Sequence, residues 1–137
     1  MADRAQVPPD IVARLRSICL ALPAAYEESA WAGTRWKIGR HNFAHAVAID
    51  AGWPPAYARA AGSKGPLVVV TFRMPESELE TARFTQRPYF KPVWWPDIVG
   101  MAIDADTDWD DVRTRLADSY RALAPKRLLK SNEDESR

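Results

Sequence analysis

The sequence predicts a compact two-layer α+β domain in which N- and C-terminal helices pack on one face of an antiparallel β-sheet. The main reason is that segments with alternating side chains lie between two terminal segments with helical apolar spacing. A second reason is the content of six tryptophans and eleven prolines, several of which flank turns or strand ends. At 137 residues the length fits one domain, which we place at residues 1–124.

The first predicted helix opens at Pro8-Pro9-Asp10 and closes at Pro23. Its apolar residues recur at helical spacing: Ile11, Leu15, Ile18, Cys19 and Leu22. This stripe is expected to pack on the sheet, with a short strand following over residues 24–30. Cys19 is the only cysteine, so we predict a buried structural thiol, no intrachain disulfide and a cytoplasmic location.

Residues 31–49 predict the hairpin around which the sheet is built, with its turn at residues 39–41. Successive strand side chains alternate, so Trp36 and Ile38 face one way while Arg35 and Lys37 face the other. In the second strand, one face is predicted to carry Phe43, His45, Val47 and Ile49. The opposite face carries alanines at 44, 46 and 48 and is smooth enough for a helix to lie close.

The rest of the chain alternates between strands and irregular segments. Residues 50–66 contain repeated Gly and Pro and predict a long loop. Residues 67–74 are the clearest central strand, 75–80 a short helix, 84–97 an aromatic-rich crossing and 98–103 the last strand. A final helix is expected after an N-cap at Thr107 or Asp108, and 125–137 is expected to be a disordered tail.

Charge is nearly balanced along the whole chain but not evenly distributed. The formal net charge is +1, which gives no global attraction to nucleic acid or membranes. Residues 31–91, however, hold nine lysines and arginines against four acidic residues. No apolar run approaches the length of a membrane span, so no membrane association is expected.

No residue pattern defines a catalytic or metal site. The alternating aspartates from Asp104 fail the EF-hand template, because Trp109 and Arg115 stand where Gly and Glu are required. His41 and His45 lie on a turn and a strand, with no acid or cysteine at ligand spacing. We therefore predict neither an enzyme nor a bound cofactor or metal.

An ordered set of residues resembles the MmcQ/YjbR family over residues 10–124. The set consists of Trp31, an aromatic at 36, Gly39, Phe43-Ala44, Pro88-Tyr89, Val99-Gly100, Asp108-Trp109 and Ser119-Tyr120. The chain departs from the family pattern at Trp36, at His41-Asn42 and in the length of the 50–66 segment. The resemblance implies a compact α+β fold of the frataxin-like, "double wing" type. Its members are often labelled DNA-binding.

Three functions are compatible with these observations. The first is DNA binding, in which a basic hairpin and the long loop contact phosphates through Arg35, Lys37, Arg40, His41, Arg59 and Lys64. The second is a protein-interaction or adaptor role on an aromatic surface formed by Trp53, Tyr57, Trp94 and Trp95. The third is a small-molecule pocket near Tyr26, Trp31 and His45. A monomer is expected in each case.

Overall fold

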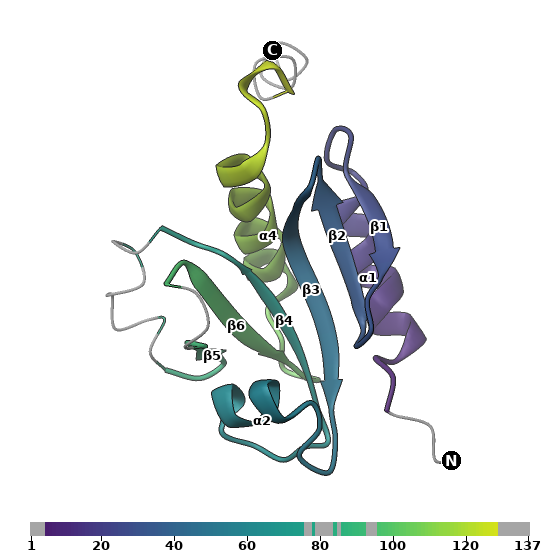
Figure 1. The fold of residues 1–137 in the computed structure, drawn as a ribbon, viewed down its shortest axis with the longest axis vertical. Helices are drawn as coiled ribbons and strands as arrows, with labels where there is room; N and C mark the ends of the chain where they lie inside the picture. The colour runs from purple at the N-terminus through teal and green to yellow at the C-terminus, as the bar shows by residue number, and fades with distance from the viewer. Residues whose placement is uncertain (1–4, 76–77, 79–83, 85, 93–95, 129–137) are drawn as a thin grey trace.

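The computed structural model describes residues 5–75, 78, 84, 86–92 and 96–128. In these residues one six-stranded antiparallel sheet has the strand order β1-β2-β3-β4-β6-β5 (Figure 1). The strands are β1 (Tyr26–Ser29), β2 (Thr34–Ile38), β3 (His41–Ile49), β4 (Leu67–Arg73), β5 (Tyr89–Phe90) and β6 (Ile98–Ile103). The labelled helices are α1 (Pro9–Cys19), α2 (Pro55–Ala61) and α4 (Trp109–Leu123). The predicted α+β class is confirmed.

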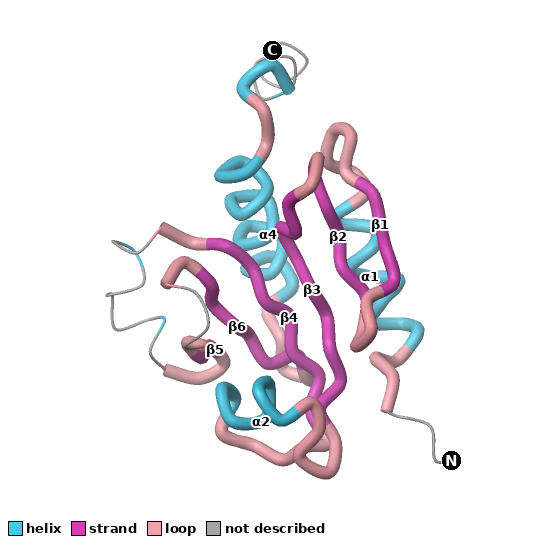
Figure 2. Tube along the Cα trace, in the orientation of Figure 1, coloured by secondary structure: helices cyan, strands magenta, loops and turns pink. Residues whose placement is uncertain are grey.

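Helices α1 and α4 cover one face of the sheet, which we call the inner face (Figure 2). Leu15 and Cys19 of α1 and Leu116 of α4 are completely buried there, in one cluster with Trp36. The predicted packing of the terminal helices is therefore confirmed. Burial also raises the pKa of the Cys19 thiol, which keeps it protonated and unreactive.

Helix α4 begins as its sequence predicts. The Asp108 side chain accepts hydrogen bonds from the backbone N–H groups of Asp110 and Asp111, and both of these acids lie in the first turn. Three carboxylates near the N-terminus stabilise the positive end of the helix dipole. The predicted N-cap is confirmed at Asp108.

The hairpin contains a register shift that the alternation of side chains did not predict. Trp36 pairs with Ala44, but the next residue, Lys37, pairs with Asn42, so Phe43 is an extra residue on β3. Phe43 consequently points to the inner face, where its ring packs edge-on against Tyr120. The prediction that Phe43 shares a face with His45 is wrong.

Ser119 of α4 bridges β3 and β4 just beyond their last pair, Ala44 and Phe72. Its hydroxyl donates to the carbonyl of Phe43 at 2.6 Å and accepts from the backbone N–H of Arg73 at 2.8 Å. The neighbouring Tyr120 hydroxyl donates to the carbonyl of Pro23. Ser119 and Tyr120 therefore join α4 to the sheet and to the segment after α1.

Residues 50–66 are not the irregular loop that was predicted, because Pro55–Ala61 forms α2. Pro55 occupies the first turn, where a missing N–H costs nothing, and Gly62 ends the helix with a left-handed φ of 67°. Ala58 and Tyr57 pack against Val47 and Val69 on the face opposite to α1 and α4. We call this the outer face.

Several predicted segments lie partly outside the described residues. Most of the short helix at 75–80, together with Trp94 and Trp95 of the crossing, belongs to this group. Within the crossing, residues 89–90 form β5, a strand that was not predicted. Of the predicted tail, the structure describes 125–128, where Leu128 packs against the core. No helix in the described ranges is long and apolar enough to cross a membrane.

Candidate functional site

Helix α2 covers only part of the outer face. Below it lie the apolar side chains of Val47, Ile49 and Val69. The part of the face beyond α2 is polar, and we call it the open half. Its side chains come from three neighbouring strands: Arg35 and Lys37 of β2, Asn42 and His45 of β3, and Thr71 and Arg73 of β4.

The strand register brings these side chains together. Arg35 lies beside His45, and His45 lies beside Thr71, so the three form a row across β2, β3 and β4. Lys37 pairs with Asn42 in the adjacent row. Residues that are directly opposite on one face of an antiparallel sheet have Cβ atoms about 5 Å apart. The open half is therefore a continuous polar surface.

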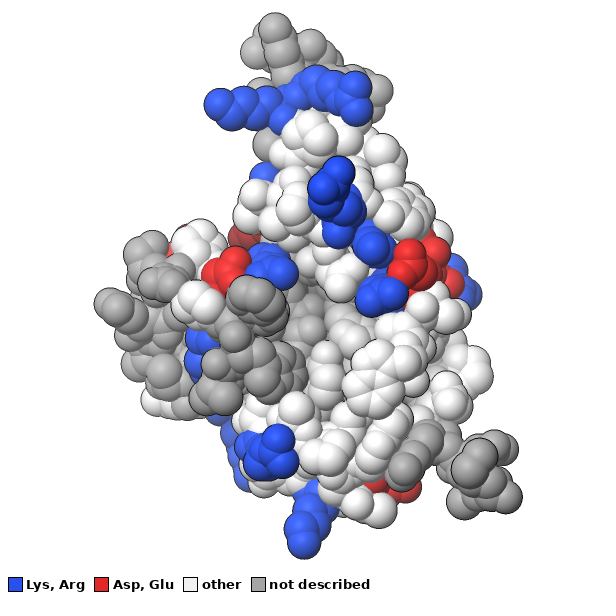
Figure 3. All heavy atoms as spheres, viewed as in Figure 1, with Lys and Arg blue, Asp and Glu red and all other residues white. Residues whose placement is uncertain are grey.

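The three cations of the open half are only partly neutralised. Arg35 forms an ion pair with Glu28 of β1, and Lys37 Nζ lies 3.8 Å from the other oxygen of the same carboxylate. Arg73 Nη1 lies 2.8 Å from Asp97. Figure 3 shows basic and acidic side chains on either side of a recessed region of this face. Two carboxylates against three cations leave an excess of positive charge.

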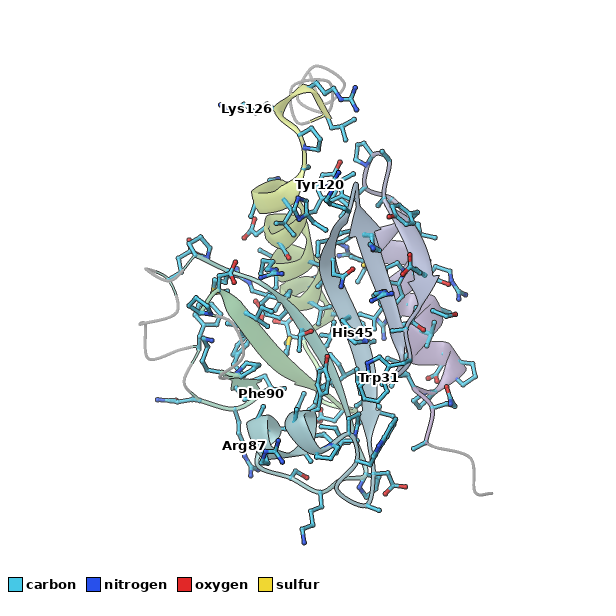
Figure 4. The ribbon with its side chains drawn as sticks, in the orientation of Figure 1. Trp31, His45, Arg87, Phe90, Tyr120 and Lys126 are labelled. Carbon is cyan, nitrogen blue, oxygen red and sulfur yellow. The ribbon has the colours of Figure 1, made fainter. Side chains whose placement is uncertain are left out.

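His45 occupies the centre of the open half and is held in one tautomer (Figure 4). Its Nε2 lies 2.7 Å from the carbonyl oxygen of Ala32, which can only accept, so Nε2 carries the proton. Nδ1 then accepts from the Tyr57 hydroxyl at 2.9 Å. Burial is the main cause that lowers the pKa of His45, with Arg35 lowering it further and the Ala32 bond opposing the shift. Burial also raises the pKa of Tyr57 to about 12, so the pair is neutral.

A small cavity, which we call the central hollow, lies beside His45 in the open half. Its volume is about 180 Å³, and Asn42, His45, Tyr57, Thr71 and Arg73 contribute to its wall. Of the wall residues that the structure describes, Arg73 alone is charged. The chain therefore presents a polar depression with one guanidinium at its rim.

The structure places the six predicted phosphate contacts in two separate groups. Arg35 and Lys37 lie together on the open half, and Arg40 and His41 are exposed at the nearby hairpin tip. Arg59 and Lys64 are exposed at the other end of the molecule, on and just after α2. The nine residues of β3 separate the groups by about 30 Å at roughly 3.3 Å per residue. The hairpin and the 50–66 segment do not form one compact basic patch.

The predicted aromatic surface is not assembled as a unit. Trp53 packs edge-on against Trp31, with ring centroids 5.4 Å apart, and Trp31 is 78% exposed. Tyr57 is instead half-buried over His45. The small-molecule pocket was placed near Tyr26, Trp31 and His45, yet only His45 lines the central hollow. Trp94 and Trp95 lie outside the described residues.

A larger cavity of about 700 Å³ lies between the end of α2, β5 and the start of α4. Phe90, labelled in Figure 4, contributes to its wall together with Arg87 and four aspartates. Among these, Asp108 caps α4 and Asp111 pairs with Arg115. In the part of the chain that the structure describes, no group of three His, Cys, Asp or Glu residues could hold a metal ion.

Sequence reasoning missed three residues of the open half, namely Asn42, Thr71 and Arg73. The 67–74 strand appeared apolar on both faces, so it was predicted to be buried on both. Its two polar residues, Thr71 and Arg73, are nevertheless spaced two apart at one end, and this spacing places them on one face. This spacing of Thr71 and Arg73 could have indicated that one end of the strand is not covered by a helix.

Comparisons of the chain with models of protein families, with characterised proteins and with solved structures gave no match. The function of the open half is therefore inferred from its own side chains. These are the three cations, the neutral His45–Tyr57 pair and the exposed Trp31 at the lower end of β1 and β2 (Figure 4).

Proposed function

We propose that this protein is an MmcQ/YjbR-like domain that binds DNA along the open half of its sheet. The observation that carries the proposal is that Arg35, Lys37 and Arg73 share one sheet surface beyond α2, where the described residues pair them with two carboxylates. Phosphate contacts from such side chains supply most of the affinity for nucleic acid. In this proposal Arg40 and His41 extend the same surface at the hairpin tip.

The charged side chains of the open half are preorganised for binding a polyanion. Arg35 and Lys37 share the carboxylate of Glu28. The side chain of Lys37 is only 16% exposed and that of Arg73 only 26%. Their stems therefore lie along the sheet, and little side-chain entropy remains to be lost on binding. An incoming phosphate would compete with Glu28, which predicts modest affinity and strong dependence on salt.

The shape of the surface favours a single strand over a duplex. Figure 3 shows a recessed region on this face, and in the described residues no helix or loop projects from the open half as a groove-binding element would (Figure 1). Trp31 is exposed at one end, where its ring is available to stack on a base. Sheet surfaces that combine cations with an exposed aromatic are typical of single-strand binding.

Fluorescence anisotropy of a labelled single-stranded oligonucleotide, titrated at several salt concentrations, tests the proposal. The double variant Arg35→Ala/Lys37→Ala is expected to reduce the slope of log affinity against log salt by about 1 to 2, because two phosphate contacts are lost. The matched control is Arg59→Ala/Lys64→Ala, which removes the same charge at the other end of β3 and should retain most of the affinity. Equal losses in both double variants, or no binding at low salt, would contradict the proposal.

A protein-binding role is the second candidate, and the exposed Trp31 favours it. Trp31 is 78% exposed and rests on Trp53, and tryptophan is enriched in protein–protein interfaces. Trp31→Ala separates the two roles. If Trp31 stacks on DNA, the variant should bind more weakly with an unchanged salt slope; if it serves a protein partner, DNA affinity should not change.

A further inference from the structure

One residue in the wall of the central hollow, Asn42, carries a buried polar atom without a partner in the described part of the chain. Asn42 Oδ1 is buried and has no hydrogen-bond partner among the described residues. Leaving such an atom without a partner costs roughly 1–3 kcal/mol, so native structures supply one from protein, water or ligand. Rotating the amide by a half-turn would place Nδ2 there, and that group would also need a partner. We therefore take the hollow beside Asn42 as the candidate position for a polar guest.

The surroundings define the charge of this guest. Arg73 lies in the wall, while Arg35 and Lys37 lie on the adjacent strand of the same face. Among the described residues no carboxylate belongs to the wall, and Glu28 and Asp97 are already engaged by these cations. His45 is neutral, and its Nδ1 already accepts from Tyr57. The field in the hollow is therefore positive and favours an anion.

The donors of the hollow suit an oxyanion. Thr71 Oγ1 donates to the carbonyl of His45 over a long 3.5 Å, so its proton can turn to a better acceptor. The Arg73 guanidinium uses Nη1 for Asp97, and its remaining N–H groups are further donors. The side-chain amide of Asn42 also carries N–H donors, so three side chains from β3 and β4 can donate to one group.

The size of the hollow limits what it can hold. At about 180 Å³ it has room for a few waters, since one water occupies about 30 Å³ of liquid. It falls short of the roughly 300–1,000 Å³ of pockets that enclose drug-sized ligands. One phosphate or sulfate group fits into a hollow of about 180 Å³, whereas a whole nucleoside does not.

We propose that the central hollow binds a single phosphate-type oxyanion through Arg73, Thr71 and the Asn42 amide. The inference rests in part on the proposed function, because one phosphate of a bound strand would occupy this position. The same chemistry is also offered by free inorganic phosphate or by the terminal phosphate of a mononucleotide. The remaining phosphates of a strand would then follow Arg35, Lys37 and Arg40 towards the hairpin tip.

Titration of the ¹⁵N-labelled protein with inorganic phosphate at constant ionic strength, followed by NMR, tests this site. We expect saturable shifts at the Asn42 side-chain amide and at the backbone amides of Thr71 and Arg73. Chloride at equal ionic strength should not produce them. Thymidine 5′-monophosphate and a short oligothymidylate then distinguish a terminal phosphate from a phosphodiester.

Two variants of the hollow test the site, so the result does not depend on the folding of either one. Asn42→Asp is nearly isosteric and adds a carboxylate to the wall, and Arg73→Ala removes the guanidinium; each should weaken phosphate binding about tenfold or more. Arg59→Ala, on α2, is the matched control and should bind as the wild type does. The amide spectrum of each variant reports whether it is folded. If Arg73→Ala does not fold, the test rests on Asn42→Asp.

The outcomes separate this inference from the proposed function. Phosphate binding that is lost in Asn42→Asp supports the hollow even if oligonucleotides do not bind, and only the proposed function then fails. Oligonucleotide binding that is unaffected by Asn42→Asp, together with no saturable phosphate shifts, contradicts the hollow while leaving strand binding intact. Phosphate binding of equal strength in the wild type and Asn42→Asp also overturns the inference.

Discussion

The two halves of the outer sheet face are built from the same strands and differ in what covers them. Under α2, β3 and β4 present Val47, Ile49 and Val69; one residue pair further along, they present His45 and Thr71. The change occurs where the hydroxyl of Tyr57, at the edge of α2, meets His45. A sheet face can therefore serve stability at one end and leave the other end for binding, with the hydrogen bond between Tyr57 and His45 at the boundary.

Truncation of the covered half should give the largest change in stability. Ile49 is 1% exposed under α2, so Ile49→Ala is expected to lower the free energy of unfolding by about 2–5 kcal/mol. Lys37→Ala, at a partly exposed position in the open half, should change it by only about 0.5 kcal/mol. Urea denaturation of both variants measures the difference. Equal losses would show that the open half carries as much folding energy as the covered half.

Ser119 should give the next largest effect, because it supports the open half from the inner face. Ser119→Ala leaves the carbonyl of Phe43 and the N–H of Arg73 without their partner, which should cost about 1–3 kcal/mol. The exposed Ser29→Ala is the matched control and should be nearly neutral. The same urea experiment measures both. A neutral Ser119→Ala would mean that the strands re-pair around the extra residue.

The smallest expected effect is the pH dependence contributed by His45 at the boundary. Its folded pKa is lowered by burial below the unfolded value of about 6.5, so the unfolded chain binds more protons between these two values. Stability should therefore fall as the pH drops below about 6.5, until the folded pKa is reached. This contribution should be absent in His45→Gln and present in the exposed control His41→Gln.

Thermal unfolding between pH 7 and pH 5 measures this dependence. Glu27, whose pKa is lowered mainly by its hydrogen bond with Arg16, acts in a different range. Its stabilisation is present above its unfolded pKa of about 4.5 and is lost as the pH falls further. A wild-type profile that is flat from pH 7 to 5 would indicate that His45 is not buried in its neutral form.

Most of the fold follows from local patterns in the sequence. The stripe that contains Leu15 and Cys19, the alternation around Trp36 and the cap at Asp108 each depend on residues close in the chain. The exceptions depend on distant contacts. Phe43 turns inward at a register shift that is completed by Ser119, 76 residues away. A period-two pattern cannot contain that information.

Helix α2 and strand β5 were missed for related physical reasons. α2 has seven residues, too few for a stable isolated helix, and it is held by contacts of Ala58 with Val47 and Val69. β5 has two residues and exists through its pairing with Gly100 and Met101 of β6. The Phe90 ring lies where a Cβ on residue 100 would be, which explains the glycine at that position. Such short elements cannot be predicted from their own residues, because contacts with distant residues stabilise them.

The candidate site was predicted in part. Alternation alone placed Arg35 and Lys37 on the face opposite to Trp36, and the structure agrees. Arg59 and Lys64 were predicted to contact phosphates from a long loop. Folding of Pro55–Ala61 into α2 holds both at the far end of β3. Arg73 was missed because its strand continues beyond the helix that covers the rest of the same face.

The most direct test of the account is a map of backbone amide shifts in the ¹⁵N-labelled protein as a single-stranded oligonucleotide is added at low salt. We expect the shifts to concentrate on β2, β3 and β4 at Arg35, Asn42, His45 and Arg73, and to disappear as salt is raised. Residues under α2, such as Ile49 and Val69, should remain unchanged. Shifts centred on Arg59 and Lys64, or none at all, would contradict the assignment of binding to the open half.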